Sequence, residues 1–327
     1  MTVPDTAKTP PASASLRQAA KAATLPLAIL LAFVLFGLVE GRVWSLANIR
    51  NIVVQGSYLA IFAMAQTVVI LTRGFDLSLG FSVSLASVAC AMAMVAVGDG
   101  GPAVFAGIAA ALAVSTLIGL ANGILIAGVG INPLVTTLGM ANIVLALAST
   151  VSGGFPVTGM PAGFNAFFSQ GAVLGLPVPT LAALLVFAAI AFVLVMTGFG
   201  RSLYIIGANP RAATAAGIRS VPVLTAAYTL CGLLTGIGAM MLTARTGSGE
   251  PNLGGNLTLE SIAAAVVGGV RLSGGEGGVG AAILGALFVT VLSNGMNLVQ
   301  IDGYLQQICL GAIIVVSLLL ARDDQRR

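Results

Sequence analysis

The charged residues of this chain are confined to short groups, and most of the stretches between them are apolar for about 18 to 25 residues. A helix of about 20 residues spans the roughly 30 Å hydrocarbon core of a membrane. Charged residues make up 7% and hydrophobic residues 58% of the 327 positions, whereas soluble domains carry about 25% charged residues. This pattern excludes a soluble fold and predicts an all-α integral membrane protein.

Turn-forming Gly, Pro and Asn separate the apolar segments and give about ten candidate transmembrane helices. The expected segments are residues 24–38, 52–72, 78–97, 103–129, 134–151, 178–197, 221–243, 257–270, 279–298 and 304–320. We therefore expect a cytoplasmic tail over residues 1–23, a transmembrane domain over residues 24–320 and a second cytoplasmic tail over residues 321–327. No small-residue cleavage site follows Leu38, so the first segment is interpreted as a retained helix.

The distribution of Lys and Arg over the short loops predicts the orientation of the chain. With the N-terminus in the cytoplasm, the far side carries only Arg42, Arg50 and Arg245. The cytoplasmic side then carries Lys8, Arg17, Lys21, Arg73, Arg201, Arg211, Arg219, Arg271, Arg322, Arg326 and Arg327. Both termini are predicted to be cytoplasmic. The same asymmetry accounts for the net positive charge, so no nucleic-acid partner is needed to explain it.

The sequence offers little material for catalysis. It has no histidine, which excludes Ser-His-Asp and Cys-His triads. Each of its cysteines, Cys90, Cys231 and Cys309, lies alone in an apolar segment without the spacing of a metal site. We expect no catalytic residue, no cofactor and no metal site.

One motif looks like part of an ATPase, but its context argues against that function. Residues 272–276 (LSGGE) match the signature sequence of an ABC nucleotide-binding domain. A P-loop needs a lysine after its glycine to reach the phosphates, and neither Lys8 nor Lys21 follows such a sequence. The motif also lies between two apolar segments, so we interpret its glycines as a tight cytoplasmic turn.

The two halves of the chain resemble each other faintly. Asn122-Gly123 precedes Leu138-Gly139 by the same spacing as Asn294-Gly295 precedes Leu310-Gly311. The offset between them covers an odd number of expected helices, so equivalent helices would cross the membrane in opposite directions. This is the inverted repeat common in transporters, with the substrate path at the repeat interface. Chance similarity between Gly-rich apolar segments is the alternative.

Two polar segments stand out from the apolar background. Residues 71–80 (LTRGFDLSLG) interrupt a long apolar stretch with Arg73 and Asp76, and either charge alone would cost at least about 2.5 kcal/mol at membrane depth. Asp76 is two residues before Ser78, so it is a candidate cap for the next helix, and the alternative is a direct part in a gate or path.

The second polar segment is the basic loop of residues 200–220. Asn209 as N-cap, Pro210 at the first helical position and Gly217 as the stop predict a short Ala-rich helix. Such a helix could dock into a partner protein. The alternative is a solvated connector whose arginines only set the topology.

At these residues the sequence resembles the ribose-type (monosaccharide) permeases of ABC importers, within the branched-chain amino acid/ribose permease superfamily. The resemblance covers most of the chain from about residue 48 onwards. It is carried by residues 71–80, by Asn122-Gly123 with residues 131–139 (INPLVTTLG), by residues 207–217 (GANPRAATAAG) and by residues 268–275 (GGVRLSGG). The sequence departs from the family pattern at Arg73, where the family has a glycine, and at Arg211, which adds a charge.

The resemblance implies a type II ABC importer-like fold and three kinds of protein partner: an ABC ATPase subunit, a periplasmic solute-binding protein and a second permease subunit, in a dimer expected to be a homodimer. The protein would lie in the bacterial inner membrane and translocate a sugar by alternating access. The resemblance assigns contact with the ATPase to Arg201, Gly207, Asn209, Arg211, Ala212, Ala213 and Gly217. Candidate pathway or gate residues are Asp76, Ser78, Asn122 and Asn294.

Other functions remain open at this stage. A nucleoside, autoinducer or amino-acid permease would fit the same superfamily. A secondary transporter driven by an ion gradient would need a carboxylate in mid-helix, and Glu260 is the sole candidate inside an expected span. A membrane-embedded enzyme would need catalytic groups that the sequence does not supply.

Overall fold

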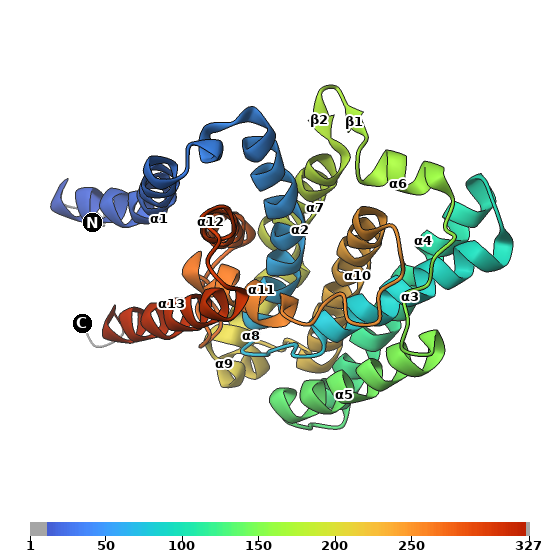
Figure 1. Ribbon diagram of the computed structural model, residues 1–327. Coiled ribbons are helices and arrows are strands. Elements are labelled where there is room, and N and C mark those ends of the chain that lie inside the picture. The colour runs from blue at the N-terminus through green and yellow to red at the C-terminus, as the bar shows by residue number, and fades with distance from the viewer. Residues whose placement is uncertain (1–11, 325–327) are drawn as a thin grey trace, which may run out of the picture.

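The computed structural model describes residues 12–324 and is almost entirely helical (Figure 1). In chain order the elements are α1 (Ala12–Val39), the 3-10 helix η1 (Gly41–Trp44), α2 (Leu46–Ile70), α3 (Leu79–Val97), α4 (Gly101–Gly123), the π-helical turn η2 (Ile124–Gly128), α5 (Pro133–Ser152), α6 (Ala162–Phe168), β1 (Ala172–Val173), β2 (Leu176–Pro177), α7 (Val178–Met196), α8 (Gly198–Ala208), α9 (Pro210–Ala215), α10 (Ser220–Thr246), α11 (Leu257–Val267), α12 (Val279–Leu298) and α13 (Gly303–Asp324).

Each of the ten expected apolar segments contains a helix. Within the described residues, seven helices are long and apolar enough to cross a membrane: α2, α3, α4 with η2, α5, α7, α10 and α12. The apolar part of α1 (Ala23–Val39) and α11 are shorter. Helix α1 begins at Ala12, inside the segment expected as a tail. Residues 1–11 of that tail and 325–327 of the other lie outside the described residues.

The connection between α5 and α7 holds structure that the hydropathy pattern did not predict. It forms the short helix α6 and a two-residue hairpin in which Ala172 pairs with Pro177. Val157 in the same connection forms an isolated antiparallel bridge with Gly249, beyond the end of α10. These elements lie at one end of the molecule, and α8 and α9 lie at the opposite end (Figure 1).

Helix α2 forms the centre of the core. Every residue from Gly56 to Ile70 is buried, and the helix packs against α7, α10, α11 and α12. Large apolar side chains of α1, α5 and α7 remain exposed, for example Leu31, Ile143 and Leu185. Exposed apolar surface of this kind suits helices whose outer faces contact lipid rather than water.

The helix contacts form matched pairs. Helix α10 packs against α3 and α4, and α2 packs against α11 and α12. Helix α3 contacts α4 and α5, while α11 contacts α12 and α13. Small residues allow these close approaches: Gly119 lies against the backbone of α10, and Gly285 lies against the backbone of α11.

The starts of α3 and α11 cross at van der Waals distance. The Gly80 amide donates a hydrogen bond to Thr258 Oγ1 (2.9 Å), and the Gly254 amide donates one to Ser84 Oγ (3.0 Å). A Cβ at Gly254 would overlap the carbonyl oxygen of Gly80. The crossing therefore requires glycine for space rather than for an unusual backbone conformation.

We expect Gly254→Ala to destabilise the protein by about 1–3 kcal/mol, because backbone atoms cannot move aside as a flexible side chain can. The control is Gly139→Ala in α5, where a Cβ meets no other atom within 4 Å. Thermal unfolding of the detergent-purified proteins measures the effect. Equal unfolding temperatures for the two variants would contradict a close crossing of α3 and α11.

Candidate functional site

Three segments that are far apart in the sequence meet at the end of the molecule that carries α8 and α9. We call them together the basic end: residues 71–73 after α2, residues 207–209 at the end of α8, and residues 274–277 before α12. The Gly275 amide donates a hydrogen bond to Leu71 O (2.9 Å), and Tyr204 Oη donates one to Gly277 O (2.9 Å). Gly207 lies so close to Leu71 and Gly275 that a Cβ there would overlap both backbones.

Arg73 ties this end together. Its Nε donates to the carbonyl oxygen of Gly207, and its Nη2 donates to that of Ala208 (2.6 Å). These carbonyls belong to the last turn of α8, where oxygens lack partners within the helix and the helix dipole favours a cation. Arg73 has φ 66°, a left-handed conformation that costs a non-glycine residue about 1–2 kcal/mol. Its two hydrogen bonds give the departure from the family's glycine a structural role.

The short helix predicted in the basic loop is confirmed as α9. Asn209 is its N-cap, and the side chain accepts hydrogen bonds from the amides of Arg211 (3.0 Å) and Ala212 (3.1 Å). Pro210 begins the helix, and Gly217 follows it with φ 76°. Helix α8, capped by Thr197, was not predicted, because an 11-residue amphipathic helix leaves no long apolar run.

The seven residues predicted to contact the ATPase fall into a buried group and an exposed group. Gly207 and Ala213 are buried and pack the two helices onto the protein. The other five lie on the exposed surface of α8, α9 and their flanks: Arg201, Asn209, Arg211, Ala212 and Gly217. The chain therefore presents a basic, capped helix with a free outer face.

Asp76, Ser78 and Asn122 converge on one buried network. Asp76 Oδ1 accepts hydrogen bonds from the Ser78 amide (2.9 Å), from Ser78 Oγ (2.6 Å) and from Asn122 Nδ2 (3.5 Å). Asn122 Nδ2 also donates to Ser78 Oγ (2.9 Å). From α2, Gln66 donates to Asp76 O (3.0 Å), and from α10, the Cys231 thiol lies 3.8 Å from Asp76 Oδ2. The network joins α2, α3, α4 and α10.

The network is shielded from solvent, and the carboxylate of Asp76 has only neutral hydrogen-bond partners. Asp76 is 3% exposed, and Ser78 and Asn122 are fully buried. Within residues 12–324, no ion pair reaches Asp76, because Arg73 binds backbone carbonyls instead. Asp76 bonds the amide of Ser78, the N-cap residue of α3, and no side chain caps the first-turn amides of this helix, so the bond is a local contact before α3 and not the predicted cap. The contact with Asn122 goes beyond this local contact.

Asn294 does not join this network. It lies in α12, and its Nδ2 donates to Asn48 Oδ1 (2.9 Å) at the start of α2. Asn48 Nδ2 in turn donates to Val43 O (3.2 Å). The four predicted pathway residues are therefore one cluster of three and a separate asparagine that joins α12 to α2.

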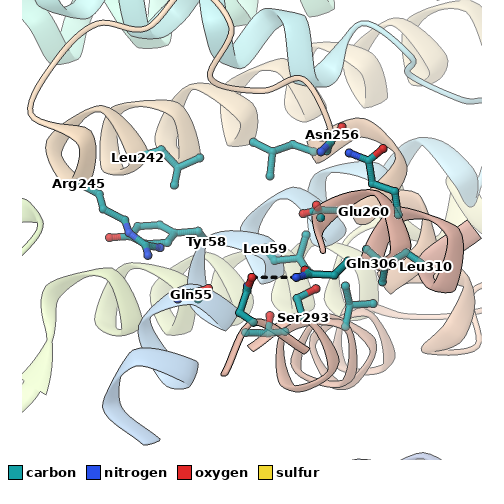
Figure 2. A pocket seen from close by; sticks show the side chains of 16 residues that line it. Gln55, Tyr58, Leu59, Leu242, Arg245, Asn256, Glu260, Ser293, Gln306 and Leu310 are labelled. Carbon is teal, nitrogen blue, oxygen red and sulfur yellow. Dashed lines mark hydrogen bonds between the residues drawn. The ribbon is translucent and has the colours of Figure 1, made fainter. Parts of the chain in front are cut away.

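A polar cavity of about 350 Å³ lies among the ends of α10, α11 and α13 and the flanks of α2 and α12 (Figure 2). Its lining residues are Gln55, Tyr58, Leu59, Leu242, Arg245, Asn256, Leu257, Glu260, Val289, Thr290, Ser293, Asn297, Gly303, Gln306, Gln307 and Leu310. Figure 2 shows the side chains of Glu260, Ser293 and Gln306 facing a common space from three helices. Apart from the mention of Glu260 and Arg245, sequence reasoning missed this cavity.

The spacing of polar residues along the helices is the sequence signal that could have indicated the polar cavity. Gln55 and Tyr58 are three residues apart, and Ser293 and Asn297 are four apart, so each pair lies on one face of its helix. Within the cavity Arg245 lies over the ring of Tyr58, 5.6 Å from its centroid. Glu260 lies in the first turn of α11, not in mid-helix.

A multi-helix membrane protein with a capped helix at one end, a buried carboxylate network and a polar cavity is built as a membrane permease. The chain belongs to the family described as "Branched-chain amino acid transport system / permease component", whose model matches residues 48–318. Members of this family are the non-catalytic, membrane-embedded components of ABC transporters.

Individual relatives share about a third of their residues with this chain. The ribose import permease protein RbsC of Bacillus subtilis is 34% identical, covering 84% of each chain. RbsC of Escherichia coli is 33% identical over 91% of this chain and 93% of its own. The galactose/methyl galactoside import permease protein MglC of Escherichia coli is 36% identical over 90% and 91% respectively. No solved structure matches the chain significantly.

The network at Asp76 predicts different outcomes for two substitutions. Asp76→Asn keeps an oxygen that accepts from Ser78, so the fold should survive while transport falls. Asp76→Leu strands buried donors, each at a cost of about 1–3 kcal/mol, so folded protein should be lost. Thermal unfolding and solute uptake measure the two effects.

The control is Asp302→Leu. Asp302 Oδ1 accepts from the amide two residues on, that of Tyr304 (2.8 Å), in the same local geometry but on the exposed surface. If Asp302→Leu destabilised the protein as much as Asp76→Leu, Asp76 would make no more than a local contact before α3.

Proposed function

We propose that this chain is the transmembrane permease subunit of an ATP-driven ABC importer for a monosaccharide, in a bacterial inner membrane. The observation that carries the proposal is the similarity to permeases named for ribose and for galactose import, over about nine tenths of the chain. An importer component of this family needs no reactive group of its own, because alternating access only requires helices that move around a path.

The partners in this proposal are an ABC ATPase, a periplasmic solute-binding protein and a second copy of the chain. Lys8 and Lys21, the two lysines of the chain, do not follow a P-loop sequence, so ATP hydrolysis is assigned to the separate subunit. The charge asymmetry of the loops supports cytoplasmic N- and C-termini. In that orientation the basic end faces the cytoplasm, where an ATPase binds.

The contact with the ATPase is assigned to the exposed face of α8 and α9. Arg201, Asn209, Arg211, Ala212 and Gly217 would touch the partner, and buried Gly207 and Ala213 would hold the helices to the permease. Both helices are short and well capped, so they can move as a rigid unit. Arg73 then transmits this movement to the end of α2.

Three helices connect the basic end with the polar cavity. Helix α2 runs from Gln55 and Tyr58 in the cavity to Arg73, and α10 runs from the loop after α9 to Arg245 in the cavity. Helix α12 follows the turn at residues 274–277 and carries Ser293 and Asn297. Helices are stiff, so a tilt of these three helices at the basic end changes the width of the cavity near their middle.

An inverted repeat of α2–α5 and α10–α13 accounts for the paired contacts. Helix α2 ends at the basic end and α10 begins there, so the two run in opposite directions. Arg245 in the last turn of α10 lies over Tyr58 of α2, while Tyr228 Oη of α10 donates to Phe75 O after α2 (3.3 Å). These reciprocal contacts support the repeat over a chance similarity, and with it the ten-helix type II arrangement.

In this scheme the Asp76, Ser78 and Asn122 network is a gate. It is closed here, and it joins four helices whose relative movement would open it. Asn294 keeps its assignment to the path, since it lies between the cavity residues Ser293 and Asn297 on α12. Glu260, the residue that an ion-driven transporter would need, lies at a helix start, which favours the ATP-driven mechanism.

The test is uptake of labelled solutes into proteoliposomes that contain this chain, with its cognate ATPase, its cognate binding protein and enclosed ATP. We expect uptake of one sugar among ribose, galactose and allose, and only when all three proteins are present. Leucine and a nucleoside serve as controls for the other substrates of this superfamily. Uptake by the chain alone, driven by an ion gradient, would overturn the proposal.

A further inference from the structure

The polar cavity has the size and lining of a small-molecule site. Its volume of about 350 Å³ is near the lower end of the roughly 300–1,000 Å³ of ligand pockets. Such pockets are usually mostly apolar with a few placed polar groups. This one has more polar groups than that: ten of its sixteen lining residues are polar or charged, although it lies within a membrane protein. Polar groups at membrane depth are costly unless they serve a solute path.

The lining chemistry selects the class of solute. Carboxamide groups come from α2, α12 and α13 through Gln55, Asn297, Gln306 and Gln307, and a hydroxyl comes from Ser293. An amide offers both donors and acceptors, and each hydroxyl group of a sugar also offers both. An uncharged, polyhydroxylated ligand can therefore satisfy these groups without an ion pair.

Tyr58 supplies a second, independent observation. It is 3% exposed, and its buried hydroxyl has no hydrogen-bond partner among the described residues. A buried hydroxyl without a partner costs about 1–3 kcal/mol. The ring is also held against Arg245, so the residue cannot turn away freely. The Tyr58 ring lines the cavity, but its hydroxyl is shielded from the cavity in this state, so a solute hydroxyl can become its partner only when the helices move.

The cavity also lies at a suitable depth. Tyr58 is 12 residues after Leu46 and 12 before Ile70, the two ends of α2, so it lies about 18 Å along the helix. That places it near the midplane of the membrane, where the substrate sites of transporters lie. Because α2 ends at Arg73, this midplane position is also linked to the basic end.

We infer that the polar cavity is a solute station within the permease itself, which holds one monosaccharide on its way through the membrane. This inference rests on the proposed importer function and names the site that the function uses. Its contacts are the amides of α2, α12 and α13, the hydroxyl of Ser293 and the ring of Tyr58. The charged residues Arg245 and Glu260 lie at its wall on α10 and α11.

Protection of an introduced thiol tests the station directly. Ser293→Cys is made in a Cys309→Ser background, because Cys309 is exposed while Cys90 and Cys231 are buried. The purified permease is placed in nanodiscs with its ATPase and is labelled with a small methanethiosulfonate. The transported sugar should slow labelling about tenfold at about ten times its Kd. Gln307→Cys gives a second reporter on the exposed part of the lining.

A matched pair of variants identifies the contact. Asn297→Leu should abolish the difference between labelling with and without sugar. Asn142→Leu, an exposed asparagine of α5 away from the cavity, should keep that difference. Loss of protection in both variants, or in neither, would overturn the station.

Testing several solutes distinguishes failure of the proposed solute station from failure of the proposed importer function. One outcome is that uptake requires all three proteins but ribose, galactose and allose leave labelling unchanged at both reporters up to about 100 mM, which corresponds to about 1.4 kcal/mol of binding. In that case the proposed solute station is wrong, while the proposed importer function still holds. Protection by leucine but not by sugars would overturn the sugar class. Absence of ATP-driven uptake would remove the proposed function itself.

Discussion

The two hydrogen bonds from Arg73 to the last carbonyls of α8 are the contact on which the arrangement of the basic end depends. They fix the end of α2 to the segment that leads into α9, and Gly275 adds a backbone bond from the turn before α12. Arg73 is held in a left-handed backbone conformation that residues other than glycine rarely adopt. The strain is offset because a guanidinium satisfies two adjacent carbonyls at once.

From that junction the rest of the transport scheme follows by rigid connection. Helices α2, α10 and α12 each leave the basic end and reach the polar cavity, while the Asp76 network sits beside the junction and joins α2, α3, α4 and α10. A displacement of α9 would therefore be felt both at a closed polar network and at a polar cavity near mid-depth. These are the two places where alternating access needs a change.

The sequence predicted what depends on local chemistry. Apolar length indicated the helices, because backbone groups in lipid must be satisfied within the helix. Asn209, Pro210 and Gly217 specified α9 through capping, whereas Asp76 accepts from the amide of the N-cap residue Ser78 and does not cap the first turn of α3. Its contact with Asn122 comes from a residue 46 positions away, which no local pattern can show.

The cavity and the Arg73 contacts were beyond prediction for the same reason. Arg73 and its acceptors are separated by more than 130 positions, and the cavity gathers isolated polar residues from five helices. Most of those residues lie within largely apolar helices, so an average over a membrane-length window conceals them. Helix spacing shows which residues share a face, but not which faces meet.

The most direct test of the account is whether ATP at the basic end changes access to the polar cavity near mid-depth. In the assembled transporter, labelling of Ser293→Cys from the outside should differ several-fold between nucleotide-free and vanadate-trapped states. Arg211→Glu on α9 should remove that difference, whereas Arg50→Glu, the same charge change at the opposite end, should leave it. An equal labelling rate in both states, in a transporter that still imports solute, would contradict the account.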